Sequence, residues 1–388
     1  MKSICFIAVL ITLFIASNLS GQKIDVRIYT KYKINSIVFS PVEGKYDLMS
    51  DSVLIYQMKK HNVILLDVIN DSINVRDLDG NIGRYKSLDI IGVGKNNYFR
   101  MKSINPDYKP RDYDDNLYVK VVGGYLLLIN NVDLEFYIAG VVESEGGIKS
   151  LPEYYKSQAI ITRTYALENL LRHSEEKYNL CDDVHCQAYH GKSLNSLDIA
   201  EATFDTKGLV IVDTTLSLIT ATFHSNCGGQ TCSSENVWLT QKSYLKSVRD
   251  SFCTESPNAT WTTTIETEKW EQFLNAYGIK TNTGTYNLNN YSFSQPYRMT
   301  YYVFNNESIA LKVIRQEWKL KSTYFNITQK GNQLIFTGKG YGHGVGLCQE
   351  GAMEMARKGY NYEEIINFYY KNIYIVSLRA LSFFKVNE

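Results

Sequence analysis

The stretch from Leu134 to Leu167 constrains the fold of this chain more than any other. It reads LEFYIAGVVESEGG and continues, after a short break, with KSQAIITRTYAL. The apolar run predicts a strand, the glycines predict a turn, and Pro152 marks the start of a helix. The turn presents Glu145, and residues in such loops take part in chemistry more often than in packing. We therefore expect one acid to lie between a sheet edge and a helix start.

The helix predicted from Pro152 has two distinct faces. Gln158, Thr162 and Tyr165 fall on one face, which can line a cleft. Alternatively, Gln158 and Arg163 have structural roles, in which they cap loops or pair with surface acids, and the spacing favours neither reading. The neighbouring face is an apolar stripe at intervals of three to four residues, formed by Ile160, Ile161, Thr164, Leu167 and Leu171.

Residues 1–21 have the layout of a secretory signal peptide. Lys2 precedes an apolar run from Ile4 to Ala16, and small or polar residues follow. The run is short for a membrane span, although an uncut signal anchor is the alternative. Cys5 lies inside the run, well before any cleavage point, which argues against a lipid anchor. We expect an exported chain that starts near Gln22 and resides in the periplasm or at the cell surface.

The composition is that of a globular protein of two or three domains, with 44% hydrophobic and 21% charged residues. The 41 basic and 40 acidic residues nearly cancel, so no charge excess indicates nucleic acid or an anionic membrane surface as a partner. Thirty tyrosines are unusual. Tyrosine suits sugar binding, but it also fills strands, and strands explain most of these residues better.

Beyond the leader, an even number of cysteines in an exported chain favours disulfides, whose pairing the sequence does not fix. Cys181 and Cys186 also form a Cys/His group with His185 and His190, and His173 lies upstream. The spacing is looser than that of a standard zinc site, so a disulfide is favoured over zinc, which stays open as a cofactor. The cysteines concerned are Cys181, Cys186, Cys227, Cys232, Cys253 and Cys348.

From residue 22 to about residue 111, short alternating runs separated by Gly, Asn and Asp predict strands and hairpins. The charged segment Asn105–Asn116 contains two prolines and marks a domain boundary. We therefore expect an α+β protein with a small N-terminal β domain, residues 22–115, for positioning or recognition, and a second domain over residues 116–388. The second domain begins with a hairpin that turns at Gly123 and Gly124.

Two glycine-rich motifs follow. HSNCGG spans His224–Gly229, where the glycines allow close approach of the backbone to a ligand or a strand. In Gly338–Ala356, five glycines surround His343 before a helix predicted to start near Gln349. Crowded glycines direct backbone N–H groups toward one point, and a helix N-terminus adds positive potential. The motif lacks the lysine and hydroxyl of a phosphate loop. Taken alone, His343 indicates a structural hydrogen bond.

The order of these motifs resembles the SpoIID/LytB family, the sporulation stage II protein D proteins and amidase enhancers. EFYIAGVVESE, KSQAIITRTYAL, YNLCDDVHCQAYHG, FHSNCGGQT and GYGHGVGLCQEGAMEMA occur in family order over about residues 116–371. Residues 22–111 lie outside the resemblance. Residues 262–333 fit loosely, so we expect a variable insertion with its own strands and a short helix over WEQFLNAYG.

The resemblance implies a lytic transglycosylase that cuts between N-acetylmuramic acid and N-acetylglucosamine of peptidoglycan and leaves 1,6-anhydro ends. The glutamate that closes the family's GVVxSE motif is Glu145 here. The family has a methionine and often a proline next, whereas this chain has Gly146 and Gly147. A single acid suffices for this reaction, and Glu143 is too close in sequence to form the opposed pair of an ordinary glycosidase. A lone glutamate in a partly closed cleft is expected to have a raised pKa.

The resemblance also implies supporting roles for residues around Glu145. Gln158 and Arg163 would position the glutamate or a sugar N-acetyl group, and Tyr165 would stack on a sugar. Cys227 would be tied to Cys253 or Cys348. The side chains expected to line the same cleft are His224, Ser225, His343 and Gln349.

Two other functional classes stay open at this point. One is a non-catalytic wall-binding protein that enhances a separate N-acetylmuramoyl-L-alanine amidase. The other is a zinc hydrolase centred on Cys181 and Cys186, although the chain has no HExxH motif. Both for the lytic transglycosylase and for the wall-binding enhancer, the expected partners are glycan strands of peptidoglycan, with a separate cell-wall hydrolase as a further partner.

Overall fold

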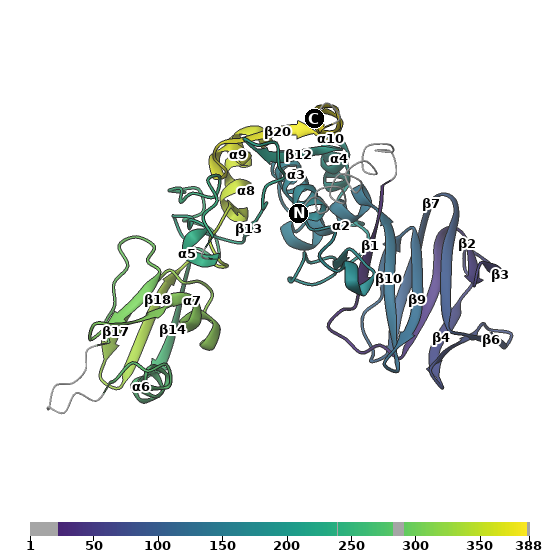
Figure 1. Cartoon of the computed structure of the whole chain (residues 1–388), viewed down its shortest axis with the longest axis horizontal. Helices are drawn as coiled ribbons and strands as arrows, with labels where there is room; N and C mark the ends of the chain where they lie inside the picture. The colour runs from purple at the N-terminus through teal and green to yellow at the C-terminus, as the bar shows by residue number, and fades with distance from the viewer. Residues whose placement is uncertain (1–21, 239, 282–290, 386–388) are drawn as a thin grey trace, which may run out of the picture. The chain divides into compact units, whose positions relative to one another are not determined.

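The computed structural model describes residues 22–238, 240–281 and 291–385 (Figure 1). The predicted signal peptide, residues 1–21, lies outside these residues. The chain forms two compact units. The first contains the chain up to Ile211 with residues 218–220 and the C-terminal segment from Ile375, and the second contains residues 212–217 and 221–374. No helix in the described part of the chain is long and apolar enough to span a bilayer.

The first unit is built on an 11-stranded sheet with strand order β11-β1-β10-β9-β7-β2-β4-β5-β6, in which β3 pairs with β2 and β8 pairs with β7. Its strands are antiparallel except for the parallel pair of β1 and β11. The strands are β1 (Lys23–Ile28), β2 (Ser36–Ser50), β3 (Val53–Lys59), β4 (Ile64–Ile69), β5 (Ser72–Arg76), β6 (Asn81–Tyr85), β7 (Ser87–Asn105), β8 (Arg111–Asp114), β9 (Asn116–Val122), β10 (Tyr125–Asp133) and β11 (Leu180–Cys181).

The long strands β2 and β7 form the centre of this sheet. Alternate residues of β2 are buried, as expected for a sheet with one covered face. Phe39 of β2 stacks on Phe99 of β7 at a centroid distance of 4.7 Å, and Phe99 in turn stacks on Tyr113. The strands predicted for the N-terminal region are confirmed, and the aromatic residues there do serve as strand packing.

The hairpin predicted around Gly123 and Gly124 is formed by β9 and β10, which pair up to Val122 and Tyr125. Both glycines have positive φ, as a two-residue hairpin turn of this type requires. The boundary predicted near Asn116 lies between β8 and β9 of the one sheet. The assignment of residues 22–115 and 116–388 as separate domains stays a prediction.

The apolar run after this hairpin is a helix, not the strand predicted from the sequence. α2 (Leu134–Gly146) begins where the side chain of Asp133 accepts a hydrogen bond from the N–H of Glu135 at 2.8 Å. Most residues from Leu134 to Val142 are buried. A short segment that is buried on all sides has no polar face to reveal its period, so a helix and a strand have the same pattern there.

α3 (Pro152–Glu168) starts at Pro152 as predicted, and it packs against α2 and α4 (Leu197–Asp205). The predicted apolar stripe is buried up to Leu167, but Leu171 lies beyond the end of α3 and is exposed. Four further elements are η1 (Ser174–Glu176), β12 (Leu209–Asp213), β20 (Ile373–Ser377) and α10 (Leu378–Lys385).

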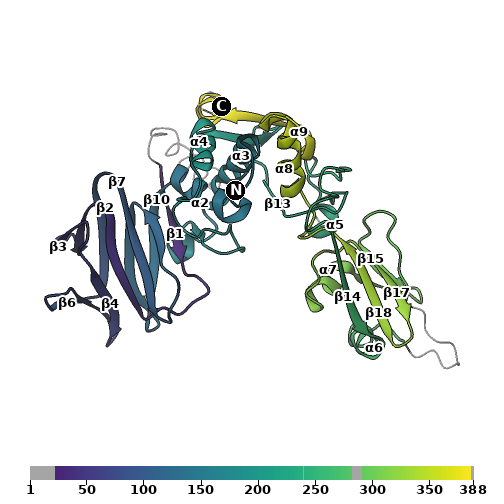
Figure 2. The same cartoon turned by 180° about the vertical axis from the view of Figure 1, so that it is seen from behind.

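One part of the second unit has a hydrophobic core of its own. Trp270 is fully buried there, edge-to-face with Tyr302 and Phe336. The predicted helix over WEQFLNAYG is present as α6, and part of the expected insertion, residues 282–290, lies outside the described residues. The elements are β14 (Thr260–Glu266), α6 (Thr267–Ala276), β15 (Tyr301–Phe304), β16 (Glu307–Ala310), α7 (Leu311–Glu317), β17 (Phe325–Lys330) and β18 (Gln333–Lys339). Figure 2 shows the strands and helices of this part, among them β14, β17, β18 and α6, from behind.

The rest of the second unit carries the two glycine-rich motifs. β13 (Phe223–His224) and β19 (Leu347–Cys348) form a short parallel pair, and α8 (Gln349–Arg357) starts at the predicted position. The sequence LSLITATF, residues 216–223, predicts a strand before HSNCGG, but only its last residue, Phe223, belongs to one. The other elements are α5 (Glu235–Trp238) and α9 (Tyr362–Tyr369). The chain as a whole is an α+β protein, as predicted.

Candidate active site

Glu145 lies in the last turn of α2, next to a helix end that only glycine forms readily. Gly147 has φ 65° and ψ −176°, and its N–H donates to the carbonyl of Glu143 at 3.1 Å. A Cβ at Gly146 would lie 2.7 Å from the hydroxyl of Tyr154. The two glycines that depart from the family pattern therefore give α2 a defined end, and Glu145 sits one residue before it.

A loop of residues 182–195, here called the covering loop, contacts the C-terminal half of α2. Its backbone binds two side chains of the VVESE motif. The N–H of Ala188 donates to Oε1 of Glu145 at 2.8 Å, and the N–H of His190 donates to Oγ of Ser144 at 3.0 Å. The covering loop therefore fixes where the Glu145 carboxyl points.

Glu143 is bound by a later part of the covering loop. Its carboxylate accepts hydrogen bonds from the hydroxyl of Ser193 at 2.7 Å and from the N–H and side-chain amide of Asn195 at 3.1 and 2.6 Å. Glu143 and Glu145 thus have separate partners on one helix end. The expectation that they form no two-carboxylate pair of the glycosidase type stays a prediction.

The Glu145 carboxyl is partly buried, and this burial raises its pKa above the ordinary glutamate value. The N–H of Ala188 opposes the shift, because a hydrogen bond to the carboxylate favours the ionised form. The net direction is upward, as expected from the sequence. The group retains a proton at a higher pH than a solvated glutamate does, which a general acid requires.

Arg163 is completely buried, and its guanidinium joins three elements. It donates to the two carboxylate oxygens of Glu135 at 3.0 and 2.6 Å, and to the carbonyls of Thr203 and Leu209 at 3.2 and 3.1 Å. This geometry favours a structural role, in which Arg163 fixes α2 against α3 and α4.

Gln158 and Tyr165 lie on the same helix but in different surroundings. Gln158 is fully buried, with its amide nitrogen 3.5 Å from the Thr162 hydroxyl and, among the described residues, no hydrogen-bond partner for its Oε1. The Tyr165 hydroxyl accepts from Arg172 and lies 3.5 Å from the carbonyl oxygen of His185. Burial raises the pKa of Tyr165 to about 12, so it stays protonated.

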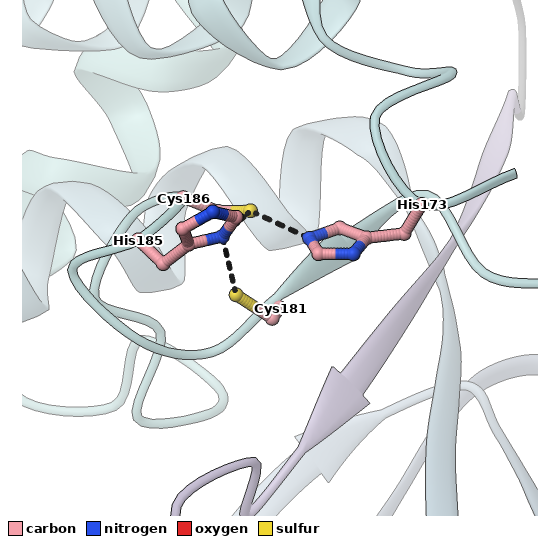
Figure 3. A group of neighbouring side chains, drawn as sticks. All are labelled: His173, Cys181, His185 and Cys186. Carbon is pink, nitrogen blue, oxygen red and sulfur yellow. Dashed lines mark hydrogen bonds between the residues drawn. The ribbon is translucent and has the colours of Figure 1, made fainter. Parts of the chain in front are cut away.

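The Cys/His residues singled out in the sequence converge at the start of the covering loop (Figure 3). Sγ of Cys186 lies 3.4 Å from Nε2 of His173 and 3.7 Å from Nδ1 of His185, and Sγ of Cys181 lies 3.8 Å from the same Nδ1. The four donor atoms lie within 4.8 Å of one another. His190 is not part of this group, which we call the Cys/His cluster, and His173 takes its place.

Two thiols and two imidazoles at this spacing fit a four-coordinate zinc ion. The thiol of Cys181 and the guanidinium of Arg172 lower the pKa of Cys186 to about 6, so this sulfur is available as a thiolate near neutral pH. The predicted disulfides are not formed, because all six cysteines in the described chain are free thiols. In this cluster both sulfurs instead face imidazole nitrogens.

The Cys/His cluster lies directly before the residue that binds Glu145. Cys186 is two positions ahead of Ala188, and Arg172 donates to the carbonyl of His185 at 3.0 Å. The cluster therefore anchors the covering loop at the point where its backbone reaches the acid.

A polar hollow of about 640 Å³ lies beside the end of α2. Glu143, Ser144 and His190 line it, together with the cationic side chains of Arg100, Arg111 and Lys192. Each of the three cations is paired with an aspartate, so the hollow presents fixed polar groups without a large excess of one charge. Such a lining suits hydroxyl and amide groups of a ligand.

The residues predicted from the two glycine-rich motifs gather around the pair of β13 and β19. The imidazoles of His224 and His343 lie 5.5 Å apart, and both contact the backbone of Val345: Nδ1 of His224 donates to its carbonyl and Nδ1 of His343 accepts from its N–H, each at 3.1 Å. Burial lowers the pKa of His224 and brings that of His343 to about 4, so both are neutral at physiological pH. Ser225 follows His224, and its carbonyl accepts from Glu350, the neighbour of Gln349.

Glu145 belongs to the first compact unit, whereas these four residues belong to the second. A cleft shared by the two groups stays a prediction.

Comparison with known proteins places this site in a family. The family model described as stage II sporulation protein matches residues 123–212, which include α2, α3 and the Cys/His cluster. Stage II sporulation protein D of Bacillus amyloliquefaciens is 30% identical over 63% of this chain and 74% of that protein. The chain belongs to the stage II sporulation protein D family.

Other members extend the similarity. Stage II sporulation protein D of Bacillus subtilis is 29% identical over 64% of this chain and 75% of that protein. The amidase enhancer of the same species is 26% identical over 62% of this chain, but this covers only 40% of that protein. The family resemblance drawn from the sequence is therefore confirmed.

Sequence reasoning about this stage II sporulation protein D family member missed one group at the site. The N–H of Ala188 holds the Glu145 carboxyl, but a backbone donor leaves no trace in residue type. The sequence offers one indication of this contact: Ala188 is two positions after Cys186, in the segment where the cysteines and histidines of the covering loop stand out.

Proposed function

We propose that this protein is a peptidoglycan lytic transglycosylase that cleaves the bond from N-acetylmuramic acid to N-acetylglucosamine. The observation that carries the proposal is the Glu145 carboxyl, held by the N–H of Ala188 at the end of α2 with a raised pKa. Membership of a family that contains stage II sporulation protein D and an amidase enhancer supports a role at the cell wall.

In the proposed reaction Glu145 acts first as acid and then as base. Its proton passes to the glycosidic oxygen as the bond to the anomeric carbon of the muramic acid breaks. The resulting carboxylate is stabilised by the N–H of Ala188. It then accepts the proton of the muramic acid 6-hydroxyl, whose oxygen bonds to the same anomeric carbon and closes the 1,6-anhydro ring. The proton returns to Glu145, and no water is consumed.

The Cys/His cluster has a positioning role in this proposal. His173, Cys181, His185 and Cys186 would hold a zinc ion, which supplies a cross-link within the fold and takes no part in the chemistry. These four side chains would supply all the ligands that a structural zinc ion takes. They would leave no open position for a water molecule, so the cluster does not favour the zinc hydrolase reading.

The remaining residues are proposed to bind or support the glycan. Tyr165 would stack on a sugar. Gln158 and Arg163 would support the packing of α3 against α2, the helix that carries Glu145. The neutral imidazoles and amides of the second unit can exchange hydrogen bonds with hydroxyl and N-acetyl groups. These are His224, Ser225, His343 and Gln349. The proposal places the protein outside the cytoplasmic membrane, in the periplasm or at the cell surface, where glycan strands are its substrate.

Product analysis tests this function. Residues 22–388 are incubated with peptidoglycan, with and without its stem peptides, and the fragments are identified by mass spectrometry. We expect 1,6-anhydro ends from the parent protein and none from Glu145→Gln. Glu201→Gln is the matched control, since it makes the same change at an exposed glutamate of α4 and should still give anhydro ends. Full activity of Glu145→Gln, or products with reducing ends, would refute the proposal.

Similarity to an amidase enhancer supports one alternative, a wall-binding protein that stimulates a separate amidase. In that case the parent protein would release no fragments by itself. It would bind denuded glycan as well as Glu145→Gln does, and both would increase product release by an added N-acetylmuramoyl-L-alanine amidase.

A further inference from the structure

A second group of metal-binding side chains lies in the second compact unit, apart in sequence from the Cys/His cluster. Cys227, Asp250, Cys253 and Cys348 are completely buried, and their donor atoms lie within 4.8 Å of one another. They come from three segments: the HSNCGG motif, the loop between α5 and β14, and the residue just before α8. We call this group the Cys/Asp cluster.

The sulfur atoms and the carboxylate of the Cys/Asp cluster face one another. Sγ of Cys227 lies 3.2 Å from Oδ2 of Asp250 and 3.3 Å from Sγ of Cys253. The N–H of Cys227 donates to Sγ of Cys348 at 3.2 Å. Cys348 is also the N-cap residue of α8, where the helix end favours a negatively charged sulfur. A backbone N–H and a helix N-terminus are groups that stabilise metal-bound thiolates.

The burial of Asp250 is otherwise difficult to explain. A buried carboxylate is costly unless it is paired with a cation or binds a metal. In the described part of the chain Asp250 has no ion pair; it accepts from the N–H of Phe252 and the hydroxyl of Tyr369, each at 2.9 Å. These bonds orient the carboxylate toward the sulfurs but bring no positive charge.

The backbone around the cluster leaves room for this carboxylate. A Cβ at Gly351 of α8 would lie 2.4 Å from Oδ2 of Asp250 and 2.3 Å from the Tyr369 hydroxyl. A Cβ at Gly228, directly after Cys227, would lie 2.7 Å from the backbone of Lys339. Glycine at these two positions therefore allows α8 and the HSNCGG motif to approach the cluster closely.

We infer that Cys227, Asp250, Cys253 and Cys348 bind a structural zinc ion through three sulfurs and one carboxylate oxygen. Zinc prefers four ligands of this kind in tetrahedral geometry. Each thiol that binds gives up its proton to solvent, so four anionic ligands surround one divalent cation. The ion would tie together the three segments that support β13, β19 and α8.

A disulfide between Cys227 and Cys253 is the competing reading. Their sulfurs are 3.3 Å apart, beyond the bond length of about 2.05 Å. Such a bond would engage two of the three sulfurs and would bring no positive charge to Asp250. The zinc site accounts for all four side chains.

The test separates this site from the Cys/His cluster. Residues 22–388 with Cys181→Ser and Cys186→Ser serve as the background, so that any remaining zinc belongs to the Cys/Asp cluster. The protein is purified without chelators, and its zinc content is measured by inductively coupled plasma mass spectrometry. We expect about one zinc per chain. Replacement by Co²⁺ should give strong thiolate-to-cobalt absorption.

Variants made in this background identify the ligands. Cys253→Ser should abolish zinc binding, and Asp250→Asn should weaken it on the order of tenfold or more. Cys232→Ser is the matched control, because Cys232 is a buried cysteine outside both clusters. It should retain the zinc and the cobalt spectrum. Circular dichroism records whether each variant is folded.

Three results would overturn the inference. The first is a background protein that holds no zinc and takes up neither Zn²⁺ nor Co²⁺ under reducing conditions. The second is a Cys227–Cys253 disulfide found by peptide mapping of the protein as purified. The third is unchanged zinc affinity in Asp250→Asn, which keeps the size of the side chain and decides the question if Cys253→Ser does not fold.

Discussion

The N–H of Ala188 donates a 2.8 Å hydrogen bond to the carboxylate of Glu145, and Ala188 is two residues after Cys186 of the Cys/His cluster. The proposed acid and the cluster are thereby joined through one short piece of backbone. A change in the cluster therefore reaches Glu145 without touching it, and this link can be tested separately from the chemistry.

Loss of the Cys/His cluster should reduce turnover more than substrate binding. In Cys181→Ser the covering loop loses an anchor, so the N–H of Ala188 no longer holds Glu145 in one position. We expect kcat for anhydro-fragment release to fall about tenfold or more, with a smaller change in KM, and the zinc content to fall. Cys232→Ser is the control, because it makes the same change at a buried cysteine outside the cluster. An unchanged kcat in Cys181→Ser that has lost the zinc of the Cys/His cluster would contradict the link.

The activity should depend on pH through Glu145. The first step needs the protonated carboxyl, and burial raises its pKa above 4.5. The rate should therefore persist above the pH at which a solvated glutamate ionises, and it should fall as the pH rises through the raised pKa. Measurement of kcat/KM for anhydro-fragment release across the pH range checks this. A decline centred at the ordinary glutamate value would show that the carboxyl is solvated during catalysis.

The same shift has a consequence for stability. The folded protein binds the Glu145 proton more tightly than the unfolded chain does, so stability is lost as the pH rises from the unfolded pKa through the folded one. Glu145→Gln has no charge to bury and should unfold at a higher temperature than the parent protein at neutral pH. The difference should disappear at a pH well below 4.5, where Glu145 is protonated in both the folded and the unfolded parent. Calorimetry at both pH values measures it; a variant that is less stable than the parent at neutral pH would argue against this burial cost.

Arg163 and Glu135 should prove to be structural partners. Arg163→Met leaves the Glu135 carboxylate buried without its cation, at a cost of about 3–5 kcal/mol in the free energy of unfolding. The double variant Arg163→Met with Glu135→Leu should recover part of this loss, since no charge then remains buried. Urea unfolding of the two single variants and the double variant forms the cycle. Additive losses would show that the two side chains do not interact.

Replacement of Gly147 should lower the stability of the protein. Its φ of 65° and ψ of −176° belong to a region that is almost restricted to glycine, so Gly147→Ala and Gly147→Asn should each lose about 1–3 kcal/mol of stability. Both should also lower activity, because the end of α2 carries Glu145. Gly123→Asn is the control: its hairpin position suits asparagine, and the variant should be nearly as stable as the parent. Equal stability of Gly147→Asn and the parent would exclude strain at this helix end.

Local signals in the sequence predicted much of this fold. The hairpin at Gly123 and Gly124, the helix start at Pro152 and the helix start at Gln349 are all marked by residues with strong conformational preferences. The sequence of α2 predicts a strand although the segment is a helix, because its sides are nearly all buried and a pattern without polar positions has no period.

The candidate site was predicted best where its residues are close in sequence, as for Cys181, His185 and Cys186. The four side chains of the Cys/Asp cluster come from segments far apart in the chain; the family resemblance associates Cys227 with Cys253 or Cys348, but nothing in the sequence singles out Asp250. Only tertiary packing brings those segments together. The same holds for the partner of Arg163, since Glu135 lies on another helix and carries no mark that distinguishes it from a surface acid.

The separate core around Trp270 gives the molecule an optical property. All four tryptophans, Trp238, Trp261, Trp270 and Trp318, lie in the second compact unit. Indole fluorescence therefore reports on that unit alone, and the first unit, with Glu145 and the Cys/His cluster, is silent in this signal. Loss of zinc from the Cys/Asp cluster, which lies in the second unit, is therefore expected to change this emission, whereas loss of zinc from the Cys/His cluster is expected to leave it constant.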